Sequence, residues 1–358
     1  MKKDKMTPRE KTRPVLCGKV QIGGGAPIAV QSMTNTFTED VIATTAQINA
    51  LTEAGIDIVR CAVPTKEAAA ALAEIRKRVS VPIIADIHFN YKLALAAIKA
   101  GADKIRINPG NIGGAGRLKA ITDAAGEAGI PIRIGVNGGS IESDLVELYE
   151  SRPAEALAES ALRNIDIVRS QGFEDIVVSI KSSDVIVNTE AHRLLASATD
   201  LPLHIGITEA GIGTQGIAKS AVGIGTLLAM GIGDTIRVSL TGDPVKEIAV
   251  ARDILRTVNL LPGQITLISC PTCGRCKIDL AFLCGQAAKE LKEIELTRKT
   301  GKPIVAALMG CSVNGPGEAA HADVGVACGI YFEKGVKVVT IEEDEIVRSL
   351  INGVKKLL

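Results

Sequence analysis

Eight short apolar runs rich in Ile and Val recur along the first two thirds of the chain, and each is followed by a segment with helical spacing. Such alternation of strand and helix predicts an α/β fold with a parallel sheet covered by helices. Eight units match a closed (β/α)8 barrel of the TIM type, and an open doubly wound sheet is the alternative. The predicted strands are 28–32, 56–61, 82–87, 104–107, 132–136, 175–180, 203–207 and 235–240.

The repeat ends at residues 261–263, which read Leu-Pro-Gly, and the pattern then changes. We therefore predict two domains: a barrel over residues 1–262 and a small α+β domain over 263–358. A chain of 358 residues is long enough to form two hydrophobic cores. In the second domain we predict a strand ending at Ser269, a helix over 278–298, a strand over 303–309, two strands around Gly329 and Lys334, and a helix over 344–357.

Charge and composition exclude several classes of protein. The 41 basic and 40 acidic side chains leave a net charge of +1, and the chain has three Tyr, five Phe and no Trp. Because nucleic-acid-binding proteins need a basic surface or stacking side chains, we expect no nucleic-acid partner. Residues 1–14 contain no apolar signal segment, and the longest apolar stretch, 220–233, is too short for a membrane span. We expect a cytoplasmic protein without a membrane partner.

Polar side chains follow nearly every predicted strand at its carboxyl end, where barrel enzymes carry their active sites. Cationic groups that meet over one barrel mouth suit a phosphate or diphosphate, because guanidinium groups bind phosphate oxygens in pairs. A ring of salt bridges with Asp86 and Glu209 is the structural alternative. The side chains are Thr34, Asn35, Arg60, Asp86, His88, Arg106, Asn108, Arg133, Asn137, Lys181, Ser182, Thr208, Glu209, Arg237 and Ser239.

Residues 211–216 read Gly-Ile-Gly-Thr-Gln-Gly, a formal match to the dinucleotide-binding pattern. The match follows the seventh predicted strand rather than the first, and the loop after strand seven of a TIM barrel is a common phosphate site. We therefore interpret these residues as a phosphate loop or a plain turn.

Six of the eight cysteines lie in the predicted second domain, and in a reducing compartment they are free thiols or metal ligands. Cys270, Cys273 and Cys276 recur every third residue in a turn with Gly and Pro, a spacing that lets one loop wrap a metal ion or cluster. Cys284, Cys311 or a carboxylate could complete the site, and a tetrahedral zinc site is the alternative to a cluster. The cysteines predicted to be small buried hydrophobes are Cys17, Cys61 and Cys328.

Two motifs in the second domain make the chain recognisable. Residues 269–274 read Ser-Cys-Pro-Thr-Cys-Gly, and residues 309–318 read Met-Gly-Cys-Ser-Val-Asn-Gly-Pro-Gly-Glu. With barrel segments 30–35, 85–90, 106–113 and 206–211, they closely resemble the 4-hydroxy-3-methylbut-2-enyl diphosphate synthase family of the methylerythritol phosphate pathway to isoprenoids. The resemblance covers nearly the whole chain and fits the short, two-domain bacterial form.

The resemblance implies an iron-sulfur oxidoreductase. Its 4Fe-4S cluster would be held by Cys270, Cys273, Cys311 and the carboxylate of Glu318, which makes zinc a minor possibility. The implied reaction is the reductive opening of 2-C-methyl-D-erythritol 2,4-cyclodiphosphate with two electrons from flavodoxin or ferredoxin. The family also implies a homodimer in which the cluster domain of one chain caps the barrel of its partner.

The resemblance also assigns residues at the barrel mouth. Glu209 is our candidate proton donor. Cys276 and Cys284 depart from the family pattern, and we expect them not to be ligands. The residues expected to bind the substrate are Arg60, Asp86, His88, Arg106, Asn108, Arg133, Asn137, Lys181, Thr208 and Ser239.

Two other functions are compatible with the residues taken alone. A non-redox sugar-phosphate lyase or aldolase would use Lys181 as a Schiff-base nucleophile and carry a structural zinc domain. An electron carrier would use the cluster alone, but that function leaves the polar barrel mouth unexplained.

Overall fold

The computed structural model describes residues 6–298, 300–311, 317, 319 and 321–358. The chain divides into two compact units, the first of which ends at Val258 and the second of which begins at Asn259. The division falls in the segment that connects helix α10, which ends at Thr257, to strand β11, which begins at Ile265. In the described part of the chain, no helix is both long enough and apolar enough to cross a membrane.

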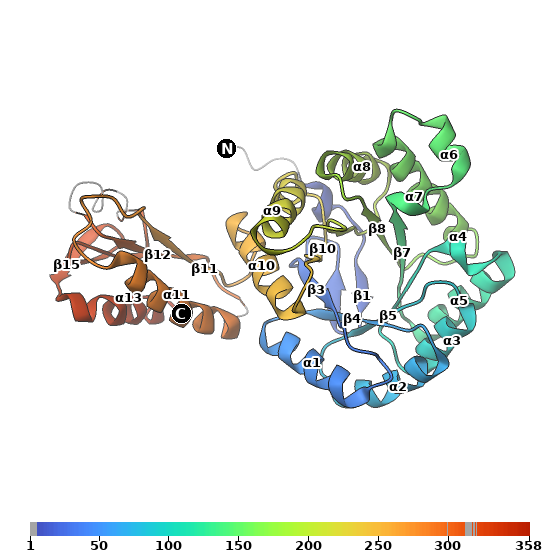
Figure 1. The fold of residues 1–358 in the computed structure, drawn as a ribbon, viewed down its shortest axis with the longest axis horizontal. Helices are drawn as coiled ribbons and strands as arrows, with labels where there is room; N and C mark the ends of the chain where they lie inside the picture. The colour runs from blue at the N-terminus through green and yellow to red at the C-terminus, as the bar shows by residue number, and fades with distance from the viewer. Residues whose placement is uncertain (1–5, 299, 312–316, 318, 320) are drawn as a thin grey trace. The chain divides into compact units, whose positions relative to one another are not determined.

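The first unit is a barrel of parallel strands surrounded by helices (Figure 1). The strand order is β8-β7-β6-β5-β4-β3-β10-β9, and a parallel bridge between Val178 and Leu203 joins the two ends. The predicted (β/α)8 barrel is therefore confirmed, and the open doubly wound alternative is wrong. The strands are β3 Ala29–Met33, β4 Ile58–Ala62, β5 Ile83–Asp86, β6 Lys104–Ile107, β7 Ile132–Asn137, β8 Ile176–Lys181, β9 His204–Ile205 and β10 Thr235–Ile236.

The helices of the first unit follow the strands, as the alternating pattern predicts. Several begin at a side-chain cap that satisfies a free backbone N–H group: Asp40 accepts from the backbone of Ala43, and Thr65 accepts from the backbone of Ala68. The helices are α1 Val41–Glu53, α2 Lys66–Arg76, α3 Tyr91–Lys99, α4 Pro109–Ile112, α5 Ala115–Ala128, α6 Ser143–Leu148, α7 Pro153–Arg169, α8 Val185–Ala198, α9 Gly213–Ala229 and α10 Pro244–Thr257.

A short hairpin precedes the barrel, formed by β1 Val15–Cys17 and β2 Val20–Ile22. Val15, Cys17 and Ile22 are buried in one cluster with barrel residues such as Ile58 and Ile84, so the hairpin adds apolar side chains to the barrel core. Two strands of three residues carry too little alternation for a sequence pattern, and for this reason the hairpin is missing from the predicted elements.

The second unit contains a five-stranded sheet in the order β11-β12-β13-β14-β15. The first three strands are parallel and the last two add in antiparallel fashion, which gives a mixed α+β unit. Helices α11 and α13 contribute Leu283, Leu291 and Leu350 to the core of this unit. Its elements are β11 Ile265–Ser269, α11 Leu280–Thr297, β12 Ile304–Met309, β13 Val324–Ala327, β14 Ile330–Glu333, β15 Val336–Thr340 and α13 Ile346–Lys355.

The strands predicted around Gly329 and Lys334 require a correction. Both residues have positive φ, 71° and 49°, and lie in the tight turns that separate β13, β14 and β15. A left-handed backbone cannot continue a strand, so the segment forms three strands where two were predicted.

Candidate functional site

Cationic side chains from several strands enter the barrel at its carboxyl end. The strand register explains why they meet: Asp86 pairs with Arg106, Arg106 pairs with Arg133, and paired residues of parallel strands point to the same face of the sheet. Lys181 is the last residue of β8 and pairs with Asn137 of β7. Among the described residues, the cations at this end are Arg60, Arg106, Arg133, Lys181 and Arg237.

Asp86 holds two of these cations. Its carboxylate lies 3.9 Å from the Nε of Arg60 and 3.4 Å from the Nη1 of Arg106. Burial acts to raise the pKa of Asp86, but the positive charges of Arg60, Arg106 and Arg133 outweigh this effect and hold the pKa below its ordinary value. Asp86 therefore stays ionised and fixes the orientation of the two arginines.

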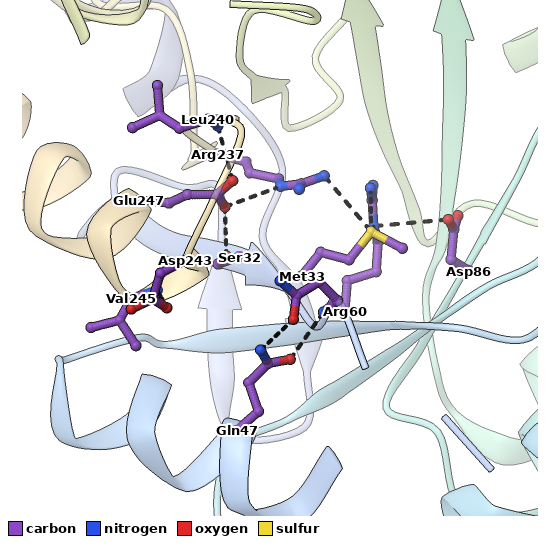
Figure 2. Close-up of polar contacts among 11 residues, drawn as sticks. Ser32, Met33, Gln47, Arg60, Asp86, Arg237, Leu240, Asp243, Val245 and Glu247 are labelled. Atoms are coloured by element: carbon purple, nitrogen blue, oxygen red, sulfur yellow. Dashed lines mark hydrogen bonds and ion pairs between the residues drawn. The ribbon is translucent and has the colours of Figure 1, made fainter. Parts of the chain in front are cut away.

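Glu247 of helix α10 is a second buried carboxylate at the mouth (Figure 2). It accepts hydrogen bonds from the hydroxyl of Ser32 at 2.6 Å and from the backbone of Leu240 at 3.0 Å, and it lies 3.7 Å from the Nε of Arg237. Glu247 and Ser32 are not among the site residues predicted from the sequence. In the sequence Glu247 is an ordinary acidic residue of an amphipathic helix, and only its burial distinguishes it.

Asp86 and Glu247 supply two negative charges, which are too few to neutralise the five cations at the mouth. Burial lowers the pKa of Arg60 to about 10, and burial together with neighbouring cations lowers the pKa of Arg133 and Lys181 below their ordinary values. Within the described structure, the Nε and Nη1 atoms of Arg133 have no hydrogen-bond partner. Buried cations without partners are costly, so this arrangement favours a bound anion over a closed ring of salt bridges.

Two glycines lie against two of these cationic side chains. A Cβ atom on Gly135 of β7 would lie 2.5 Å from the Nε and 2.7 Å from the Nη2 of Arg106. A Cβ on Gly206 would lie 2.6 Å from the backbone oxygen of Arg237 and 3.1 Å from the Nζ of Lys181. Gly135 therefore allows the guanidinium of Arg106 to lie against strand β7, and Gly206 allows close approach of both the Arg237 backbone and the Lys181 side chain.

We expect the Gly135→Ala variant to bind inorganic diphosphate about tenfold more weakly, because the new methyl group displaces the guanidinium of Arg106 from Asp86. Isothermal titration calorimetry measures this affinity. Gly139→Ala is the matched control, since its Cβ would meet no atom within 4 Å. Equal affinities of the two variants would contradict the role of Gly135.

The other substrate-binding residues predicted from the sequence also follow the barrel strands. The carboxamide of Asn108 accepts from the backbone of Gly110 at 3.1 Å and caps α4. His88 is exposed and its ring stacks on Phe89 with 4.7 Å between centroids. Thr208 and Ser239 are half-buried in the segments after β9 and β10. Their roles in binding stay predictions.

Glu209, the predicted proton donor, is exposed in the segment between β9 and α9, and its φ is 52°. Left-handed conformations are unfavourable for residues other than glycine, and they occur often at functional sites. The backbone carbonyl of Glu209 accepts from the Nζ of Lys219 at 3.3 Å. The left-handed backbone of Glu209 is typical of a functional residue. The role of Glu209 as proton donor stays a prediction.

The loop with the Gly-Ile-Gly-Thr-Gln-Gly pattern lies between β9 and α9. Gly211 and Gly213 have positive φ, and helix α9 begins at Gly213. A Cβ on Gly216 would collide with the backbone of Gly211, which explains this glycine as a close approach between loop and helix. The loop belongs to a barrel rather than to a Rossmann sheet.

In the second unit, two of the predicted ligands lie at one edge of the sheet. Strands β11 and β12 are neighbouring and parallel, with Ser269 opposite Leu308, so Cys270 and Cys311 follow the same ends of adjacent strands. The backbone N–H of Gly310 donates to the Sγ of Cys270 at 3.5 Å. Cys311 is buried and Cys273 is exposed.

The ligand set is only partly described. Glu318 lies outside the described residues, and among those described no three His, Cys, Asp or Glu side chains converge as a metal site. The chemistry of the described donors still fits an iron-sulfur cluster, because soft thiolates are its usual ligands. The N–H group that reaches Cys270 is the kind of contact that such clusters use to stabilise their sulfur ligands.

Cys276 fills the space beside Gly310. Its thiol donates to the carbonyl of Ile278 at 3.3 Å, and a Cβ on Gly310 would collide with its sulfur. Gly310 is therefore confined by sulfur atoms on two sides, that of Cys270 and that of Cys276.

We expect Gly310→Ala to lower the iron content of the purified protein at least about threefold, because the new Cβ must push Cys276 or the strand end that carries Cys311. The double variant Gly310→Ala/Cys276→Ala, in which the colliding sulfur is absent, should recover most of the iron. Iron analysis of anaerobically purified protein measures both. A double variant as poor in iron as the single one would contradict this steric cause.

The remaining cysteines differ from one another. Cys17 and Cys61 are buried as predicted, and burial raises the pKa of both thiols to about 11. The prediction for Cys328 is wrong, because this residue is exposed in the turn between β13 and β14 with a φ of 51°. Its apolar neighbours in the sequence belong to the two strands, and the turn itself faces solvent.

Comparison with known proteins identifies the family. The GcpE TIM-barrel domain matches residues 12–252, and the GcpE protein C-terminal domain matches residues 266–356. The chain belongs to the GcpE family. The predicted family is confirmed across both units.

Curated members of the GcpE family match almost the whole chain. A protein named 4-hydroxy-3-methylbut-2-en-1-yl diphosphate synthase (flavodoxin) from Caldanaerobacter subterraneus subsp. tengcongensis is 50% identical over 98% of both chains. Proteins of the same name from Bacillus licheniformis and Bacillus subtilis are 50% and 49% identical over 98% of this chain and 95% and 92% of theirs.

A solved structure supports the barrel fold independently. The crystal structure of a type I 3-dehydroquinate dehydratase from Clostridium difficile superposes with a TM-score of 0.51, over 70% of this chain and 98% of the other. The two sequences are only 14% identical, so this likeness concerns the fold alone.

Proposed function

We propose that this protein is a 4-hydroxy-3-methylbut-2-en-1-yl diphosphate synthase, which reductively opens 2-C-methyl-D-erythritol 2,4-cyclodiphosphate with two electrons. The observation that carries this function is the 50% identity to synthases of that name over 98% of both chains. The non-redox lyase alternative is not favoured, because both domains of the GcpE family match the chain.

The cationic barrel mouth supports a diphosphate substrate. Arg60, Arg106, Arg133 and Lys181 provide donors that can form charge-assisted bonds to phosphate oxygens, which are stronger than bonds between neutral groups. Asp86 holds Arg60 and Arg106 in place before the substrate arrives, so the binding geometry is formed in advance. We expect His88, Asn108, Asn137, Thr208 and Ser239 to complete the substrate site, and Glu209 to donate a proton to the leaving oxygen.

We propose that the iron-sulfur group is a 4Fe-4S cluster held by Cys270, Cys273, Cys311 and Glu318. When bound, such a cluster supplies electrons one at a time. The adjacent carboxyl ends of β11 and β12, which carry Cys270 and Cys311, support this assignment. The N–H of Gly310 donates to the sulfur of Cys270, and this bond would stabilise the thiolate form that binds iron.

The proposed function also implies a partner chain, an electron donor and a compartment. We propose a homodimer in which the cluster domain of one chain covers the barrel mouth of its partner, excluding water from the substrate. Large apolar side chains in the segments after β3, β5 and β9 support a covered mouth, since Phe37 is 81% exposed and Phe89 and Ile212 are each 65% exposed. Reduced flavodoxin is the proposed electron donor, with ferredoxin as a substitute, and the cytoplasm is the proposed compartment.

The first test is the iron, acid-labile sulfide and zinc content of protein purified without oxygen. We expect roughly four iron and four sulfide per chain, followed by formation of the linear diphosphate from the cyclodiphosphate with reduced flavodoxin. One zinc per chain and no sulfide would refute the reductive function. Iron and sulfide without turnover of the cyclodiphosphate would refute the substrate assignment alone.

A further inference from the structure

The sulfur of Met33 lies among the arginines of the barrel mouth. Met33 ends strand β3 and pairs with Arg60 of β4, so both side chains point into the barrel. The sulfur accepts hydrogen bonds from the Nε of Arg60 at 3.1 Å and from its Nη2 at 2.9 Å. It also lies 3.8 Å from the Nη1 of Arg237, as the dashed lines in Figure 2 show.

A thioether is a poor partner for these donors. Its sulfur is a weak, neutral hydrogen-bond acceptor, whereas Arg60 and Arg237 carry full charges. Neither arginine has a carboxylate in close contact among the described ion pairs: Asp86 lies 3.9 Å from the Nε of Arg60, farther than the sulfur, and Glu247 lies 3.7 Å from the Nε of Arg237, about as far as the sulfur lies from its Nη1. The position between the two guanidinium groups is therefore suited to an anionic oxygen and is filled here by a neutral sulfur.

Methionine is suited to leave such a position. Its side chain is unbranched and has three rotatable bonds, so the sulfur can move without displacing the backbone. Met33 is half-buried, so part of its side chain borders solvent rather than packed protein atoms. A phosphate oxygen that takes its place would exchange weak contacts for charge-assisted hydrogen bonds.

We infer that Met33 is a displaceable placeholder, whose sulfur occupies the phosphate-oxygen position between Arg60 and Arg237 and swings away when a diphosphate binds. Met33 is a positioning residue, because it acts through the two arginines. In the free protein it holds the guanidinium groups apart and partly satisfies their donors. This inference rests on the diphosphate substrate of the proposed function.

The chain offers a direct spectroscopic test, because it contains only five methionines. We would label the methionine methyl groups of the purified protein with 13C, assign the Met33 signal by Met33→Leu, and titrate with inorganic diphosphate. Calorimetry on the same sample measures binding separately. We expect the Met33 methyl signal to shift along the same saturation curve as the heat, while the signal of Met230, the C-cap residue of helix α9, stays in place.

The outcomes separate this inference from the proposed function. A saturable heat of diphosphate binding, together with a matching shift of the Met33 methyl signal, supports the placeholder role of Met33. Saturable heat with an unmoved Met33 signal overturns the placeholder and leaves the diphosphate site intact. Absence of heat at millimolar diphosphate overturns the inference together with the diphosphate part of the proposed function.

Two variants test the competition between sulfur and phosphate. Met33→Gln supplies a stronger acceptor for Arg60, so we expect diphosphate binding to weaken about three- to tenfold. Met33→Leu keeps a similar volume without an acceptor, so its binding should equal or exceed that of the wild type. Met230→Leu is the matched control. Weakening by more than about threefold in Met33→Leu, or unchanged binding in Met33→Gln, would overturn the inference.

Discussion

Replacement of Cys311 with Ser is expected to remove most of the iron and sulfide and to reduce the rate of the reductive reaction at least about 1000-fold. A serine hydroxyl is a poor substitute for a thiolate, because it stays protonated near neutral pH and is a harder ligand. Cys311 is buried just after β12, beside the strand that leads to Cys270, so exposed side chains are poorly placed to replace it as a ligand. Metal analysis and the absorption of the cluster measure the first effect, and an anaerobic assay measures the second.

The control for Cys311 is Cys276→Ser. Cys276 lies close to the same strand end, but its thiol donates to the carbonyl of Ile278. We expect this variant to retain its iron and most of its activity. If Cys276→Ser loses its iron and Cys311→Ser keeps it, Cys276 rather than Cys311 is the cluster ligand.

The second large effect concerns Lys104, which begins β6 and is completely buried. Within the described structure its Nζ has no hydrogen-bond partner, and burial lowers its pKa from 10.5 to about 8. Each unit of pKa shift corresponds to about 1.4 kcal/mol, so the charged group destabilises the fold by about 3 kcal/mol at pH 7. We expect Lys104→Met to raise the free energy of unfolding of the barrel by this amount, measured by chemical denaturation.

The gain from Lys104→Met should depend on pH. Between about pH 8 and pH 10.5 the unfolded chain binds the lysine proton and the folded chain releases it. The stability of the wild type therefore rises with pH across this window, and the advantage of the variant shrinks until it vanishes above about pH 10.5. Lys99→Met, at an exposed position of α3, should show no such trend. A gain that is constant from pH 7 to pH 10.5 would show that repacking, and not the charge, is responsible.

The sequence alone determined the barrel, because short apolar runs alternate eight times with segments of helical spacing. Strand β6, for example, is fully buried and was predicted with its observed bounds. Active sites of TIM barrels lie at the carboxyl ends of their strands. This rule placed four cations at one mouth without any knowledge of their contacts: Arg60, Arg106, Arg133 and Lys181. The paired motifs around Cys270 and Cys311 identified the family, because their residue types and spacing are visible in the sequence without a structure.

Only the tertiary structure decided which side chains touch. Ser32 and Glu247 are 215 positions apart in the chain, and Met33 and Arg237 are 204 positions apart, so no local pattern could pair them. The exposure of Cys328 depends on a turn, and the burial of Lys104 depends on the closure of the barrel. Local periodicity specifies the elements, whereas the partners of a buried charge are set by closure of the sheet, which brings distant strands together.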